Sequence, residues 1–508
     1  MTGDPGEAGQ DGHGGRNGFG RQVRAEWTKL RTVRGWVVGL AAAALAIVLV
    51  GLLSALPATC HGDCTGPRGP GGVRADDRFY LVHQPLTGDG GITVRLTSLT
   101  ADGSSGALPP WAKAGVIVKE STAAGSAYAA VMATAGHGVR MQDRFTHDRA
   151  GLPGAVSEQS PRWLRLVRSG ETLTGYQSVD GADWTEIAAV RLAGLPSTVQ
   201  IGLFAASPPA TAATGRKFGG TDNSGSPTRA TAAFDQISVS GAAPGGSWTG
   251  EQIGDSAADD FASVGDFRPS GAGLSVTGSG DIAPTVGGPL NAGGQTVERS
   301  LLGTFLGLIL VVVVGATFIT AEYRRGLIRS TLTASPRRGR ALAAKAVVIG
   351  AATFAAALPG AGAAVLLSKW RLGPNGFAFA VAPLTELRVV VGTAALLAVT
   401  AVLATAVGTV LRRGAGAVTV VFAVTVLPYL LATASFLPVG PARWLLRLTP
   451  AAGFAIQQNM PYYPQVDGSY TPAFGYFPLA PWAGFAVLCG WTALALGLAA
   501  FRLRGRDA

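Results

Sequence analysis

The carboxylates Asp180 and Asp183 are the side chains in this sequence best placed to bind a cation or a sugar. They lie in the segment 178–184, whose Asp and Gly residues are also typical of a tight hairpin turn. Glycosidic hydrolysis needs a close pair of carboxylates as acid and nucleophile, and the sequence contains no Glu-x-Asp-x-x-Glu pattern. We therefore expect a structural turn here, with calcium or sugar binding as the alternative, and no catalysis.

Other residue types that support chemistry are sparse. His83, His137 and His147 do not have the close spacing of metal ligands. Cys489 lies in an apolar run, which leaves Cys60 and Cys64 as the one candidate disulfide pair. No Gly-x-x-x-x-Gly-Lys-Ser/Thr loop is present, so the usual cradle for ATP phosphates is missing. We expect a chain that is not an enzyme and holds no cofactor or metal.

The composition points to a membrane protein. Of the 508 residues 48% are hydrophobic and only 14% are charged, with a mean hydropathy of +0.31. A helix needs roughly 20 apolar residues to cross a bilayer. Six runs of this kind predict transmembrane helices at 35–56, 301–320, 346–367, 389–411, 415–437 and 483–501.

Basic residues predict how these helices are oriented. The formal net charge is +11, but Lys and Arg cluster beside the apolar runs rather than as a nucleic-acid surface, so no nucleic-acid partner is expected. They flank every second helix end, at 21–34, 324–340, 412–413 and 502–506. Because short basic flanks stay in the cytoplasm, both termini are predicted to be cytoplasmic and residues 57–299 extracellular. The rival interpretation of 35–56 as a cleaved signal peptide is disfavoured, because its apolar run is too long.

Between the first two helices the pattern changes to short alternating strands. About nine such segments between 79 and 241, joined by Gly, Asp and Ser turns, predict an all-β antiparallel sandwich of jelly-roll type. Residues 57–78 form a linker to it. Residues 242–299 are rich in Gly and Ser and form either a β extension, with a strand near 274–277, or a flexible stalk.

Two short segments are expected on the cytoplasmic side. Residues 1–18 are Gly-rich and predicted to be disordered. In 19–34 the apolar residues recur at helical spacing, which indicates an amphipathic helix on the inner leaflet or, alternatively, a simple basic flank. The apolar residues of this face are Phe19, Val23, Trp27 and Leu30. A second amphipathic helix is predicted at 322–335, before Pro336, and suits docking into a groove of a partner.

The membrane part resembles actinobacterial permeases of the ABC-2 exporter type. The resemblance rests on the six spans, on Ala25-Glu26-Trp27-Thr28-Lys29-Leu30 before the first span, and on Glu322-Tyr323-Arg324-Arg325-Gly326-Leu327-Ile328-Arg329 after the second. It implies that 322–335 is the coupling helix that touches a separate ATPase subunit, which would bind ATP and Mg. The residues it assigns to this contact are Glu322, Tyr323, Arg324, Arg325, Leu327, Ile328 and Arg329. It also implies a homodimer or a second permease.

The segments 114–120, 163–170 and 176–184 resemble bacterial concanavalin A-like sandwich domains related to lectins and glucanases. This resemblance implies a jelly roll and makes an extracellular glycan a candidate ligand. Two functions are therefore open: an ATP-driven export permease in the cell membrane, or a membrane-anchored receptor for carbohydrate or cell wall. One span would suffice as an anchor, so six favour transport.

Overall fold

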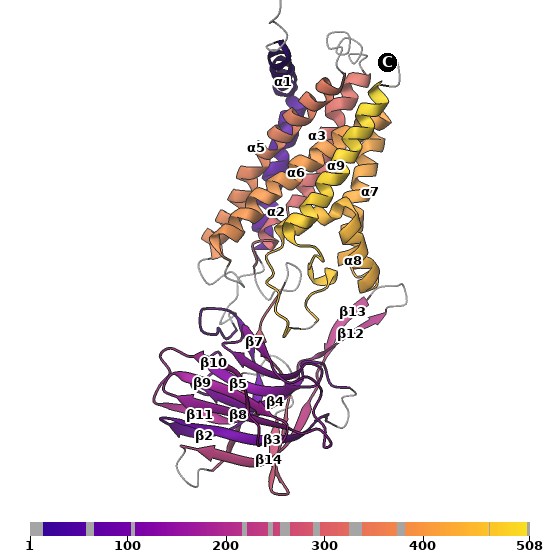
Figure 1. The fold of residues 1–508 in the computed structure, drawn as a ribbon. Helices are drawn as coiled ribbons and strands as arrows, with labels where there is room; N and C mark the ends of the chain where they lie inside the picture. Colours follow the sequence, from indigo (N-terminus) through magenta and orange to yellow (C-terminus); the bar gives the residue numbers. More distant parts are fainter. Residues whose placement is uncertain are drawn as a thin grey trace, which may run out of the picture.

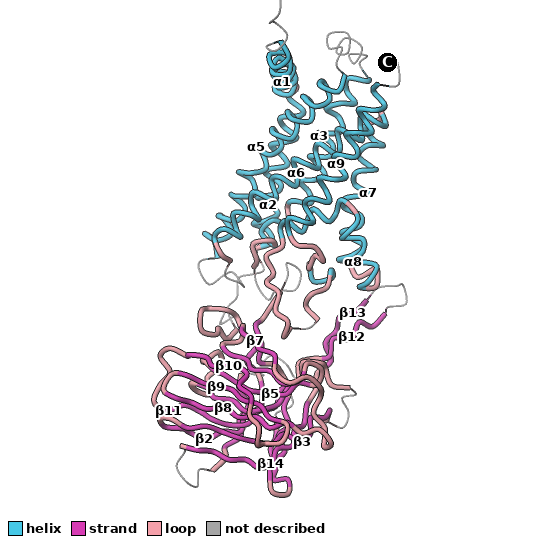
Figure 2. Tube along the Cα trace, in the orientation of Figure 1, coloured by secondary structure: helices cyan, strands magenta, loops and turns pink. Residues whose placement is uncertain are grey.

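The protein consists of a β domain joined to a bundle of long helices (Figures 1 and 2). The computed structural model describes residues 14–56, 66–102, 107–215, 221–241, 247–254, 265–287, 295–324, 338–372, 381–466 and 468–504. We call the end of the bundle that carries α1 and the last residues of α9 the terminal end, and the opposite end the sandwich end (Figure 1).

The helices are α1 (Gly14–Thr32), α2 (Arg34–Ser54), η1 (Arg299–Leu301), α3 (Thr304–Arg324), α5 (Arg338–Leu372), α6 (Pro383–Leu411), α7 (Gly414–Thr433), α8 (Val439–Leu448), η2 (Pro450–Gln457), η3 (Pro472–Phe474) and α9 (Pro481–Arg504). Each predicted apolar run lies largely on one helix, although α5, with 35 residues, extends well beyond its run of 346–367. Among the described residues, six are long and apolar enough to cross a membrane: α2, η1 with α3, α5, α6, α7 and α9. The chain is therefore a multi-pass membrane protein, as predicted.

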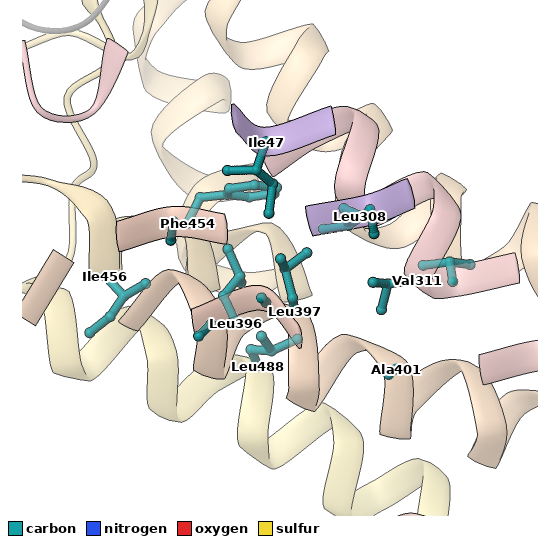
Figure 3. Packing of buried hydrophobic residues seen from close by; sticks show 14 of the residues in the cluster. Ile47, Leu308, Val311, Leu396, Leu397, Ala401, Phe454, Ile456 and Leu488 are labelled. Carbon is teal, nitrogen blue, oxygen red and sulfur yellow. The ribbon is translucent and has the colours of Figure 1, made fainter. Parts of the chain in front are cut away.

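Helix α6 forms the centre of the bundle. It packs against α3, α5, α7, α9 and η2, and 72% of its apolar window is buried inside the protein, compared with 28% for α2 and 22% for α9. Leu396, Leu397 and Ala401 of α6 belong to one buried cluster with Leu308 of α3 and Phe454 of η2 (Figure 3). The outward faces of α2 and α9 keep large apolar side chains exposed, as expected where lipid is the solvent.

The β domain contains two stacked antiparallel sheets. The strands are β1 (Ala75–Asp77), β2 (Phe79–Thr87), β3 (Gly90–Ala101), β4 (Lys113–Lys119), β5 (Tyr128–Thr134), β6 (Gly138–Asp143), β7 (His147–Ala150), β8 (Arg162–Ser169), β9 (Thr172–Ser178), β10 (Thr185–Arg191), β11 (Thr198–Ala206), β12 (Ala210–Gly215), β13 (Thr221–Ser226), β14 (Ala230–Ser240), β15 (Thr249–Ile253), β16 (Asp266–Ser270), β17 (Gly273–Gly278) and β18 (Ile282–Pro284). One seven-stranded sheet has the order β10-β9-β8-β3-β14-β17-β16 and the other β15-β2-β11-β4-β5-β6-β7.

Alternating side chains fill the space between the sheets. Val94 and Leu164 from one sheet join Val116 and Val131 from the other in a single buried cluster, which is what period-2 patterning on both sheets produces. Gly175 allows the sheets to approach, since a Cβ there would lie 2.6 Å from the side chains of both Val131 and Met141. The predicted fold class, six apolar helices with an antiparallel β-sandwich between the first and second, is confirmed.

Strands β1 and β18 pair with each other and form the neck between the domains. Two fully buried lysines of β4 hold this neck against the sheet: Lys119 Nζ lies 2.8 Å from Asp77 Oδ2, and Lys113 Nζ lies 2.6 Å from Asp281 Oδ1. Burial raises the pKa of Asp77 and of Asp281, although the neighbouring lysines act in the opposite direction. The neck is thus held to the sandwich by two ion pairs, of which Lys119–Asp77 is fully buried and Lys113–Asp281 is largely buried.

The sandwich also contacts the loop that precedes α9. Gln465 Nε2 donates to the carbonyl of Phe145 at 3.0 Å, and Val286 beyond β18 packs with Met460 and Tyr470. A cavity of about 600 Å³ remains at this junction, lined by Trp111 and several prolines of the sandwich and by Val466. The two domains are therefore joined by side-chain contacts as well as by the chain itself.

Candidate functional site

Four charged side chains from three helices meet at the terminal end of the bundle. Lys345 Nζ of α5 lies 2.7 Å from Glu26 Oε2 of α1 and 2.5 Å from Glu322 Oε1 of α3. Lys29 Nζ of α1 lies 2.9 Å from Glu26 Oε1 and 3.1 Å from Glu322 Oε1. We call Glu26, Lys29, Glu322 and Lys345 the charge cluster. Each carboxylate bonds both lysines, so the cluster links α1, α3 and α5.

Most of the charge cluster is removed from water. The exposed fraction of the side chain is 3% for Lys345, 6% for Glu26 and 8% for Glu322, while Lys29 keeps 41%. Two positive and two negative charges balance, which is the condition under which buried charges are tolerated. The ring of Phe318 lies 5.3 Å from Lys345 Nζ and adds a cation–π contact.

The ionisation of Lys29 reflects these neighbours. Desolvation is the largest single influence and lowers the pKa of Lys29, but hydrogen bonds and charges from Glu26 and Glu322 together outweigh it. The pKa of Lys29 is therefore raised above its ordinary value. Lys29 stays protonated, and so remains a partner of both carboxylates.

The charge cluster lies at both ends of the segment predicted to couple to an ATPase. Glu322 lies in the last turn of α3 and Lys345 in the third turn of α5. Of the residues assigned to the coupling contact, Glu322, Tyr323 and Arg324 are described, whereas Arg325, Leu327, Ile328 and Arg329 lie outside the described residues. Arg324 is exposed, and the guanidinium of Arg412, at the end of α6, lies 5.5 Å from the ring of Tyr323.

Part of the predicted apolar face of α1, namely Val23 and Leu30, packs against the protein. The helix begins at Gly14 rather than Phe19. Leu30 is buried, but Trp27 is 41% exposed. Glu26, three residues after Val23 and therefore on the same side of the helix, is buried, with an exposed fraction of 4%. Sequence reasoning missed Glu26 because a lone acid beside arginines resembles a solvated charge.

Two further contacts bring the helix ends together at the terminal end. Arg338, at the start of α5, donates to the carbonyl of Leu503 in the last turn of α9 at 2.7 Å. Arg502 donates to the carbonyl of Val410 near the end of α6 at 3.4 Å. Cations placed against the free carbonyls of helix C-termini are stabilising. The start of α5 is therefore held to α9 as well as to α1 and α3.

Asp180 and Asp183 lie in a hairpin turn of the sandwich. Asp180 Oδ1 accepts from the amides of Ala182 at 2.9 Å and Asp183 at 3.0 Å, and from the hydroxyl of Ser178 at 2.9 Å. These hydrogen bonds, from the amide of Asp183 first, lower the pKa of Asp180 to about 2. The arrangement is an Asx turn, and it uses Asp180 Oδ1 to bind the chain's own backbone.

The remaining predicted site residues have simpler surroundings. His83 hydrogen-bonds Gln200 and His137 stacks on Trp111. Cys60 and Cys64 lie outside the described residues. In the described part of the chain no group of three or more His, Cys, Asp and Glu side chains is arranged to hold a metal ion.

Residues 228–508, more than half of the chain, match the sequence profile of a family described as "ABC-2 family transporter protein". The matched region covers the helices from α3 to α9 and part of the sandwich, including β14. No match was found among curated proteins.

Solved structures similar to part of the chain carry no functional argument, because their TM-scores are low. Scytalido-glutamic peptidase with a transition state analog inhibitor is 11% identical, with a TM-score of 0.25, and covers 40% of this chain and 98% of its own. A functionally unknown protein from Saccharomyces cerevisiae is 13% identical, with a TM-score of 0.21, and the match covers 32% of this chain and 73% of the yeast protein. The alginate lyase from Klebsiella pneumoniae is 12% identical, with a TM-score of 0.17, and the match covers 30% of this chain and 60% of the lyase. The concanavalin A-like identity of the sandwich stays a prediction.

Proposed function

Because this chain belongs to the ABC-2 transporter family, we propose that it is the membrane-spanning permease of an exporter driven by a separate ATP-binding subunit. ATP and Mg bind to that subunit, since the sequence has no phosphate-binding Gly-Lys loop. The terminal end of the bundle faces the cytoplasm, where the basic flanks belong. The sandwich then lies outside the cell.

The observation that carries this proposal is the charge cluster. Residues 325–337 connect α3 to α5. Close to this connection, Glu322 of α3 and Lys345 of α5 form ion pairs with Lys29 and Glu26 of α1. A force applied by a partner to the connecting segment reaches three helices at once. Transport by alternating access requires such a transfer of motion to the spans.

The segment 322–335 supplies the docking surface. Arg324 is exposed at the end of α3, and Arg325 and Arg329 add positive charge in the sequence that follows. These charges suit a partner with an acidic groove, and the apolar Leu327 and Ile328 suit its floor. The pathway itself forms between two permease copies, either a homodimer or a pair of related chains.

Charge reversal at the docking segment tests this proposal. The full-length protein is purified in mild detergent from its native host, as the wild type and as the Arg324→Glu, Arg325→Glu double variant, and bound proteins are identified by mass spectrometry. We expect a P-loop ATPase with the wild type and about tenfold less or none with the variant, because like charges then face each other.

The matched control is the Arg31→Glu, Arg34→Glu double variant, which makes the same charge change at two exposed residues at the same end of the bundle. It should retain the ATPase. Recovery of cell-wall material with the wild type, and of no ATPase, would overturn the proposal in favour of a surface receptor.

A further inference from the structure

Three consecutive residues at the end of η2, Gln457, Gln458 and Asn459, connect η1, α3, α6 and the start of α9 at the sandwich end. The side chain of Gln457 donates to the hydroxyls of Thr304 in α3 and Thr393 in α6, at 3.2 and 3.0 Å. Gln458 Oε1 accepts from the amide of Phe477, just before α9, at 2.5 Å. The short helical segment η2 is thus fixed to α3, α6 and the start of α9 by polar contacts at its end.

The peptide group between Gln458 and Asn459 is held from both sides. Its N–H, on Asn459, donates to Glu298 Oε1 at 2.6 Å. Its carbonyl, on Gln458, accepts from Arg388 Nη2 at 2.5 Å. Glu298 immediately precedes η1, and Arg388 lies in the second turn of α6. One peptide group therefore joins the entrance of the second span to the entrance of the fourth.

We call Glu298, Arg388 and the Gln458–Asn459 peptide group the clamp; Glu298 is buried, whereas Arg388 and Asn459 are half-buried. Glu298 is 8% exposed, and its second oxygen, Oε2, has no hydrogen-bond partner among the described residues. The rings of Phe305 of α3, Tyr429 of α7 and Phe454 of η2 contact one another, with centroids 4.6, 4.9 and 5.1 Å apart. The clamp and these rings hold η2 in the sandwich end of the bundle.

We propose that Glu298 and Arg388 are positioning residues that hold η2 in place, and that η2 is released when this clamp opens and exposes Glu298 to water. The assignment goes beyond the proposed transport function, and it can be measured without the ATPase or the cargo. Its link to transport rests on that function.

The ionisation of Glu298 gives the clamp a pH dependence with a definite sign. Desolvation by burial, which outweighs the amide of Asn459 and the charge of Arg388, raises the pKa of Glu298 to about 7. In an open clamp the carboxyl returns towards its ordinary value of 4.5. The closed state therefore binds the proton more tightly, is favoured at low pH, and loses this advantage as the pH rises through 7.

Other charges near the sandwich end do not replace Glu298 in this role. Arg388 is the charge that acts on Glu298 most directly. Several other charged groups lie on the surrounding elements. Glu386 of α6 pairs with Lys369 of α5, and Arg443 of α8 donates to the carbonyl of Tyr470. Arg299 lies in η1, and Arg74, just before β1, lines the same cavity as Asn459.

Hydrogen exchange of the Asn459 amide tests the clamp in the full-length protein in lipid nanodiscs. After correction for the intrinsic exchange rate, we expect protection to fall about tenfold between pH 6 and pH 8, as the two pKa values of Glu298 require. In Glu298→Gln the side-chain oxygen still accepts from the amide but cannot ionise. Protection should then stay high and independent of pH.

A second variant and a control make the result decisive. Arg388→Gln removes the charge that lowers the pKa of Glu298, so the midpoint of the pH dependence should move upwards while protection falls at every pH. Glu386→Gln, a matched change in the same helix, should behave as the wild type. An unchanged pH dependence in Glu298→Gln, or its absence from the wild type, would overturn the proposal.

Discussion

Replacing Lys345 by Met is expected to destabilise the helical part by about 3–5 kcal/mol, because it leaves Glu26 and Glu322 buried with only the half-exposed Lys29 as a partner. The apolar stem of the side chain is retained, so the loss reports on the charge. We would measure it as a shift of the unfolding transition in mixed detergent micelles. In the same samples, cysteine cross-linking between α1 and α5 should become less efficient.

Two further variants separate charge from packing in this experiment. Lys345→Met combined with Glu322→Gln leaves a balanced Glu26–Lys29 pair and should recover more than half of the loss. Lys369→Met, on the same helix, breaks a pair in which the side chain of Lys369 is 41% exposed, and it should cost at most about 1 kcal/mol. Equal losses for Lys345→Met and Lys369→Met would show that the charge cluster does not hold α1.

Replacing Lys119 by Met should have a comparable effect on the sandwich. Lys119 and Asp77 are both 0% exposed, so the variant strands a buried carboxylate that also accepts from the amide of Gly125 at 2.7 Å. We expect a loss of about 3–5 kcal/mol. It should appear as faster proteolysis of the sandwich in the full-length protein, with the helical part still intact.

The control for the neck is an ion pair at the surface. Arg191, whose side chain is 75% exposed, pairs with Glu171 across 2.9 Å, and Arg191→Met should leave the proteolysis rate unchanged because exposed pairs contribute little. The double variant Lys119→Met, Asp77→Asn should be more stable than Lys119→Met alone. If Lys119→Met behaved as Arg191→Met, the neck would be held by other contacts.

The sequence predicted the elements of this fold far better than the contacts between them. Long apolar runs identify spanning helices because water is absent from the bilayer core, and alternation identified the region between 79 and 241 where strands such as β5 and β9 form the sandwich. The neck was not predicted. The two strands β1 and β18 are only three residues long and pair across about 200 residues of chain, and no local pattern encodes such a partner.

The charge cluster shows why the site was only half predictable. Glu322 was expected at the coupling segment, but Lys345 looked like a residue at the edge of a span, and Glu26 like one charge among arginines. Their pairing joins residues separated by 319 positions in the chain. A buried lysine at the start of an apolar run was the available signal, since such a charge requires a partner.

The most direct test of the central claim is photo-cross-linking from within the docking segment. A photoreactive amino acid is placed at Leu327 of the full-length protein in its native host, and a second sample carries it at Phe436, which is 57% exposed near the sandwich end. After irradiation, covalent adducts are identified by mass spectrometry. The account predicts a P-loop ATPase attached at Leu327 and not at Phe436. Adducts at Leu327 that contain no ATPase, with cell-wall or lipid material alone at both positions, would contradict it.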